Sequence, residues 1–166
     1  MGVDSRAIPS VIEIRLPALD QSGQRSVEEA LPAEPLGGDR YRLLASPGLV
    51  EGIAAGDELE LAPNELAGFR VLQRGGQLCI WVYVTEPPPA ETDARLARAA
   101  AAIGGYLDGG NTRLRILTVP MGAGFARVAA ELDAAVADLG DSTWAYGNVY
   151  DSRNGDRPLG WWDALT

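Results

Sequence analysis

The stretch from Phe69 to Val84, Phe-Arg-Val-Leu-Gln-Arg-Gly-Gly-Gln-Leu-Cys-Ile-Trp-Val-Tyr-Val, decides the fold. Two runs rich in β-branched and aromatic residues flank Gly75-Gly76, a pattern that predicts a tight β-hairpin. In the second run the even-numbered residues are aliphatic and the odd-numbered ones are Cys79, Trp81 and Tyr83, so neither face is polar. We therefore expect a central strand that is covered on both faces and lies at the junction of two halves of the chain.

The half that precedes this junction has the pattern of an all-β unit. Val11–Leu16 alternates apolar and charged residues, as a half-buried strand does. Val27–Leu36 carries acids and two prolines and predicts an interrupted or edge strand. Arg40–Leu44 and Ile53–Leu61 supply further strands. Short strands at a spacing of roughly ten residues, with turn residues between them, predict a small β-barrel or a curled antiparallel sheet.

After the junction, strands alternate with helices. An apolar stripe predicts a helix from about Glu91 to Ile103, and apolar residues at helical spacing predict a second one from about Gly124 to Leu139. Two short strands lie between the helices, and Ser142–Tyr150 has the pattern of a last strand. Counted from Leu78, the order is β-α-β-β-α-β, which is that of a ferredoxin-like unit. The predicted fold class is α+β.

These patterns divide the chain into three parts. Residues 9–76 form the all-β half, residues 77–150 form the ferredoxin-like half, and residues 151–166 form a C-terminal tail that contains Trp161-Trp162. The tryptophan pair allows two interpretations. It packs back on the sheet or hairpin, or it is an exposed aromatic anchor for a partner, because tryptophan is favoured in interface hot spots.

Charge and composition narrow the classes of partner. The chain carries 23 acidic and 14 basic side chains, a formal net charge of −9, and all basic residues are arginines. Such a chain repels nucleic-acid phosphates, so we expect no nucleic-acid binding; acidity favours either plain solubility or a basic protein partner. No apolar run approaches the ~18 residues of a membrane span. Residues 1–10 lack the apolar core of a secretory leader, and the single Cys79 suits a reducing compartment. We expect a cytoplasmic protein.

Most catalytic constellations are excluded by the residues that the chain lacks. Without histidine there is no Ser-His-Asp or Cys-His arrangement, and the histidine and cysteine ligands of a structural zinc site are missing. Cys79 lies in the middle of a predicted strand, where a buried, inert thiol is expected. Gly122-Ala123-Gly124 resembles a phosphate-binding loop, but Arg127 occupies the third glycine position, so we interpret it as a capping turn. We predict no catalytic residue, metal ligand or cofactor.

Carboxylates remain as candidate functional groups. Two acidic stretches without a basic residue run from Ser26 to Asp39 and from Glu51 to Glu65. They form a solvated face, an acidic docking surface, or a pair of carboxylates for acid–base hydrolysis. From the docking interpretation we predict a partner-binding surface that consists of six residues: Glu51, Asp57, Glu58, Glu60, Trp161 and Trp162.

A family resemblance rests on residues 31–57. The segment Leu-Pro-Ala-Glu-Pro-Leu-Gly-Gly-Asp-Arg-Tyr-Arg-Leu at 31–43, Pro47, and Gly-Ile-Ala-Ala-Gly-Asp at 52–57 resemble the pattern of a bacterial family of small stand-alone proteins of unknown function. The resemblance spans roughly Val11 to Tyr150, and it departs at Pro32 and Gly48, where that family has aromatic residues. It implies no catalytic residues. Small acidic proteins of this kind resemble immunity proteins, which bind and neutralise a cognate secreted toxin.

Two functions from different classes therefore stand. The first is a non-catalytic interaction protein, an immunity factor that presents acidic and aromatic surface to a basic toxin domain. The second is a small-molecule-binding or regulatory module of ferredoxin-like type, with Arg113 and Arg115 converging on a pocket. A hydrolase based on two carboxylates is a distant third.

Overall fold

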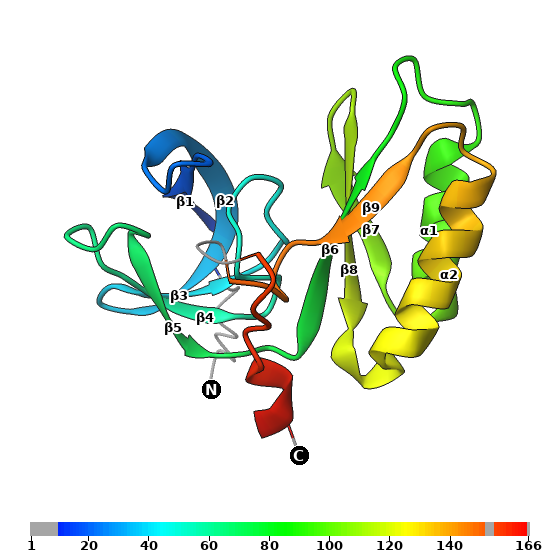
Figure 1. Cartoon of the computed structure of the whole chain (residues 1–166). Coiled ribbons are helices and arrows are strands. Elements are labelled where there is room, and N and C mark those ends of the chain that lie inside the picture. Colours follow the sequence, from blue (N-terminus) through cyan, green and yellow to red (C-terminus); the bar gives the residue numbers. More distant parts are fainter. Residues whose placement is uncertain (1–9, 152–154, 166) are drawn as a thin grey trace, which may run out of the picture.

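The computed structural model describes residues 10–151 and 155–165, and these residues form two antiparallel sheets with two helices. The sheets lie side by side, and both helices cover the face of the second sheet that is turned away from the first (Figure 1). The α+β class expected from the sequence is confirmed. Among the described residues, no helix has the length and apolarity needed to cross a membrane.

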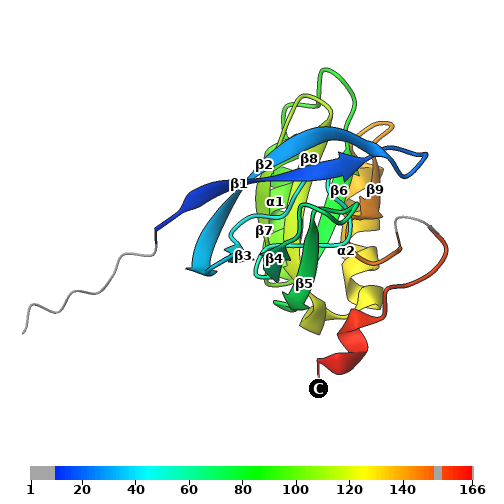
Figure 2. The ribbon, with the colours of Figure 1, turned by 90° about the vertical axis from the view of Figure 1, so that its left-hand side faces the viewer.

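The first sheet is an open meander of five strands in the order of the chain. The strands are β1 (Ile12–Leu19), β2 (Arg25–Gly37), β3 (Arg40–Leu43), β4 (Glu58–Leu61) and β5 (Phe69–Gln73). No ladder within the described residues joins β1 to β5, so the barrel alternative is wrong. The first two strands form a long hairpin that curves over the shorter strands (Figure 2), whereas β5 leads away into the second sheet.

Strand β2 lies inside this sheet, and the prediction of an interrupted or edge strand over Val27–Leu36 is wrong. It runs unbroken for 13 residues and pairs with both β1 and β3. Its prolines are tolerated because each lies where only one neighbour is in register. Pro32 lies opposite Glu13 of β1, and Pro35 lies opposite Tyr41 of β3. The amide hydrogen that proline lacks is therefore not needed for a second ladder.

Gly75-Gly76 does not form the predicted hairpin turn, because β5 and β6 (Gln77–Tyr83) belong to different sheets. The two glycines instead carry the chain across from one sheet to the other. A Cβ on Gly75 would lie 2.6 Å from the carbonyl oxygen of Gly56, so only glycine allows the two backbones to approach so closely. The stretch therefore connects the two sheets, and the prediction of paired strands is wrong.

The second sheet has the order β7-β8-β6-β9, and all neighbouring strands are antiparallel. After β6 come α1 (Thr92–Ala102), β7 (Tyr106–Gly110), β8 (Leu114–Pro120), the short 3₁₀ helix η1 (Met121–Ala123), α2 (Phe125–Ala137) and β9 (Thr143–Tyr146). Both predicted helices are confirmed to within a few residues. Gly124, with a φ of 83°, is the N-cap residue before α2, so Gly122-Ala123-Gly124 is a turn that leads into the helix.

Strand β6 is the centre of the molecule, as predicted. Leu78, Ile80 and Val82 are fully buried under the helices in the larger apolar core. On the opposite face, Cys79 and Trp81 are buried against Ala54 and Leu114. Burying both faces of one strand explains why its sequence contains no polar residue between Gln77 and Tyr83.

The loop of residues 44–57, between β3 and β4, covers this second face and joins the two sheets. The carbonyl oxygen of Pro47 accepts a 2.7 Å hydrogen bond from Nε1 of Trp81. The hydroxyl of Thr118 in β8 donates to Asp108, so the hydroxyl of Ser46, 2.6 Å away, donates to Thr118. The amide nitrogen of Ser46 also donates to Asp108, at 2.6 Å. These bonds lie in a largely buried region, where a lost partner is costly.

Candidate functional site

Glu58 and Glu60, two of the predicted partner-binding acids, are already paired with arginines. They lie on β4, and the adjacent strands place Arg42 and Arg70 beside them. Arg42 lies 2.8 Å from Glu58, and Arg70 lies 2.7 Å from Glu60. Arg42 also reaches Glu34 of β2, at 2.9 Å. Arg70 likewise pairs with a second acid, Glu65, at 3.0 Å. The β4 acids are therefore engaged in ion pairs within the sheet.

Asp57 is a buried structural residue with only 1% of its surface exposed. Its carboxylate accepts hydrogen bonds from the amide nitrogens of Ala54, at 3.0 Å, and Gly75, at 2.9 Å. Nη1 of Arg74 lies 3.3 Å away. Burial raises the pKa of Asp57 and lowers that of Arg74, so desolvation outweighs the attraction between them. Asp57 holds the 44–57 loop to the crossing between the sheets and cannot touch a partner.

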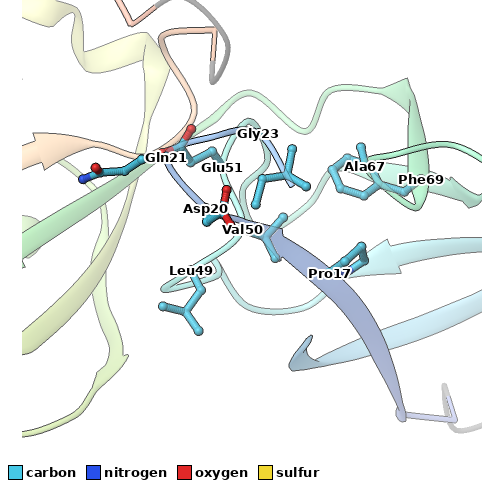
Figure 3. Close-up of a pocket in the computed structure, with 10 residues that line it drawn as sticks. Pro17, Asp20, Gln21, Gly23, Leu49, Val50, Glu51, Ala67 and Phe69 are labelled. Atoms are coloured by element: carbon cyan, nitrogen blue, oxygen red, sulfur yellow. The ribbon is translucent and has the colours of Figure 1, made fainter. Parts of the chain in front are cut away.

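Glu51 is exposed on the same loop and differs from the other acids of that region. Its carboxylate makes no hydrogen bond or ion pair with any described residue. Partial burial raises its pKa. It lies at a cavity of about 330 Å³ that is lined by both apolar and polar residues (Figure 3). Of the four predicted acids, only Glu51 is both exposed and unpaired.

Trp161 and Trp162 form most of a second short 3₁₀ helix, η2 (Trp161–Ala164), which lies where the two halves meet (Figure 1). Nε1 of Trp161 donates a 2.8 Å hydrogen bond to the carbonyl oxygen of Asn148. The guanidinium of Arg74 lies 5.4 Å above the ring of Trp161, a cation–π distance. Both tryptophans pack against the larger core but remain partly exposed. The tail therefore packs back on the body of the protein and still presents aromatic surface.

The two tryptophans belong to a continuous row of five aromatic rings. Successive rings meet edge to face with centroids 4.9–5.6 Å apart, in the order Trp144, Tyr146, Phe125, Trp162 and Trp161. We call these five residues the aromatic row. Burial raises the pKa of Tyr146 to about 12. Each of these residues is half-buried, so each one packs on the core and is also partly exposed to solvent.

Sequence reasoning missed three members of the aromatic row. Trp144 and Tyr146 are two residues apart on β9, so their side chains share a face. Phe125 is the first residue of α2. The alternation at 144–146 was a usable signal, but only the folded chain shows that the tail returns to this face.

The predicted six residues do not form one surface. Asp57 and Trp161 come together through Arg74, which contacts both. Glu58 and Glu60 lie on the outer face of the first sheet, and Glu51 lies at the cavity. The arginines named for a small-molecule pocket are also neutralised: Arg113 pairs with Glu86 at 2.8 Å, and Arg115 with Asp93 at 2.5 Å.

Groups able to perform covalent or metal chemistry are scarce in the described part of the chain. Cys79 is completely buried, and burial raises the pKa of its thiol, so the nucleophilic thiolate is disfavoured. Residues 10–151 and 155–165 contain no group of three cysteine or acidic side chains placed to hold a metal ion.

Comparison with known proteins identifies the family. Residues 29–144 match the model of a domain of unknown function, DUF4265. The chain belongs to this family. The predicted resemblance to a family of unknown function is thereby confirmed, and it covers the whole 44–57 loop. Among curated proteins, none matches the sequence.

One solved structure shares the fold of this DUF4265 protein. It is a crystal structure of a hypothetical protein from Neisseria gonorrhoeae, with a TM-score of 0.63 and 12% sequence identity. The match covers 83% of this chain and 94% of the other chain. At this identity the likeness shows the fold alone.

Proposed function

We propose that this DUF4265 protein is a non-catalytic interaction module that binds a basic protein, in the manner of an immunity protein that neutralises a cognate toxin. The single observation that carries the proposal is the aromatic row. Five partly exposed aromatic rings in contact are typical of interface hot spots, which are enriched in tryptophan and tyrosine.

Charge supports a basic partner. The chain has a net charge of −9, and Asp133 and Asp163 lie at the aromatic row. Asp133 accepts a 2.8 Å hydrogen bond from Nε1 of Trp144, and Asp163 lies within η2 beside the tryptophan pair. Acids that rim an aromatic centre steer a basic partner to the surface and accelerate association at low salt. In the predicted interface this surface replaces the β4 acids, which are already paired with arginines within the first sheet.

The second half supports an alternative function. We infer that it is ferredoxin-like, because its β-α-β-β-α-β order and antiparallel β7-β8-β6-β9 sheet match what such a unit requires. Units of this kind also serve as small-molecule or regulatory modules. This alternative needs a pocket with convergent polar groups, and the pairing of Arg113 and Arg115 with Glu86 and Asp93 leaves these two arginines less available for it.

The test is capture of the partner and measurement of its affinity. The tagged full chain is incubated with lysate of its own organism at low salt, and bound protein is eluted by raising the salt. We expect one basic protein in stoichiometric amount, which is then purified for titration calorimetry. Trp162→Ala should weaken binding by at least ~30-fold, the effect of losing a hot-spot residue.

The matched control is Leu72→Ala, which removes an exposed apolar side chain on β5, outside the aromatic row. It should change the affinity less than about threefold. The proposal fails if no basic protein is eluted, or if Trp162→Ala and Leu72→Ala bind the partner equally well.

A further inference from the structure

The cavity beside Glu51 has the composition of a ligand site, and the proposed interaction surface does not use it. It lies in the first half between the turn of the β1–β2 hairpin, the 44–57 loop and the start of β5 (Figure 3). Its volume of about 330 Å³ falls at the lower end of the ~300–1,000 Å³ typical of small-ligand pockets. Six of its ten lining residues have apolar side chains: Pro17, Leu19, Leu49, Val50, Ala67 and Phe69.

The charged side chains of the cavity are both acidic. Asp20, Gln21 and Glu51 are the polar side chains that line it, and no arginine is among the lining residues. The carboxylate of Asp20 accepts hydrogen bonds from the hydroxyl of Ser22 and the amide of Gln24, which lower its pKa and keep it ionised. The cavity therefore carries negative charge with nothing on its wall to balance it.

Glu51 is the group to which a bound ligand would supply a hydrogen-bonding partner. Glu29, on the neighbouring strand β2, is by contrast satisfied within the fold, because it accepts hydrogen bonds from the amides of Gly48, Leu49 and Val50, at 2.7–3.1 Å. Glu51 makes no such contact with the described residues, although part of its surface is withdrawn from water. An unpaired and partly desolvated carboxylate gains most from a cation that brings its own hydrogen-bond donors.

We propose that this cavity binds a small free organic cation, an alkylammonium or alkylguanidinium, with its charged group on Glu51 and its hydrocarbon stem against Leu49, Val50 and Phe69. Anions are repelled by the two carboxylates, and a neutral ligand leaves Glu51 without a partner. Lysine and arginine side chains of a protein carry the same chemistry. The volume of the cavity favours a free molecule. The experiment below distinguishes a free cation from a cationic side chain of a protein.

The experiment is titration calorimetry of the full chain with hexylammonium and butylguanidinium. Both should bind saturably. Methylammonium, which lacks the stem, and hexanol, which lacks the charge, should each bind at least about tenfold more weakly, and hexanoate should not bind. Glu51→Gln should weaken hexylammonium binding about tenfold without lowering the thermal midpoint, because its side chain holds nothing in the fold.

Glu131→Gln on α2 makes the same chemical change outside the cavity and should leave the affinity unchanged. Leu49→Ser should weaken hexylammonium but not methylammonium. The inference is overturned if hexylammonium does not bind saturably, if Glu51→Gln binds it as tightly as the natural chain, or if an N-acetyl-arginine amide binds while both free cations do not. None of these outcomes depends on the aromatic row, so they are independent of the proposed protein partner.

Discussion

Replacing Asp57 by alanine should be among the most damaging single changes in the first half. The substitution leaves the guanidinium of Arg74, whose side chain is 20% exposed, without its counter-charge, and it deprives the amides of Ala54 and Gly75 of their acceptor. Removing one partner of a buried ion pair costs about 3–5 kcal/mol. A domain of this size is stable by only ~5–15 kcal/mol, so we expect the loss of at least about a fifth of the free energy of unfolding.

The assay is urea unfolding followed by tryptophan fluorescence, with the free energy obtained from the midpoint and slope. Glu60→Gln is the control, because it breaks the more exposed pair with Arg70 and should cost under ~1 kcal/mol. In the double variant Asp57→Ala/Arg74→Met the unpaired buried charge is gone, so part of the loss should be recovered. A cost below about 1 kcal/mol for Asp57→Ala, or strictly additive effects in the double variant, would refute the role assigned to this pair.

Three further predictions concern other close contacts. Gly105→Ala should prevent folding or lower the thermal midpoint by many degrees, because the added Cβ would clash with the carbonyl oxygen of Thr118 in β8. Gly109→Ala is the control and should fold normally, because the space around Gly109 is open. Trp81→Phe should cost ~1–3 kcal/mol in urea unfolding, because it leaves the Pro47 carbonyl without its 2.7 Å partner; an unchanged midpoint would contradict this. Cys79 should react with a disulfide reagent only in urea, since burial raises the pKa of its thiol; rapid labelling of the native protein would show that the site opens.

Local patterns predicted local structure well, and long-range pairing badly. The two apolar faces of Leu78–Val84 and the helical spacing of Phe125–Leu139 report burial directly, so the central strand and α2 were correctly placed. The prediction of a hairpin turn at Gly75-Gly76 was wrong because a Gly-Gly dipeptide is equally suited to a tight turn and to a place where two backbones approach closely. Only contact with Gly56, 19 residues earlier, distinguishes the two cases.

The prediction that six residues form one partner-binding surface missed their actual placement for a similar reason. Glu58 and Glu60 stand in a stretch without arginines, so the sequence shows an acidic run. Their partners Arg42 and Arg70 come from the strands on either side of β4. The spacing of residues along the chain does not reveal how these strands are aligned with β4. The tail tryptophans were recognised as noteworthy, but their neighbours in the aromatic row are supplied by α2 and β9.

The residues that carry the family resemblance have structural roles in the loop between the sheets. The carbonyl of Pro47 accepts the Trp81 hydrogen bond, Gly52 and Gly56 adopt positive φ angles of 90°, and Asp57 fixes the loop to the crossing. The positive φ angles explain the glycines and the buried hydrogen bonds explain Asp57 without invoking a ligand, whereas any residue at position 47 would supply the carbonyl that Trp81 contacts. A pattern of this kind identifies how two sheets are joined and says little about what binds. The function of this protein is therefore better sought at the aromatic row and at Glu51, which are not among the residues that carry the family resemblance.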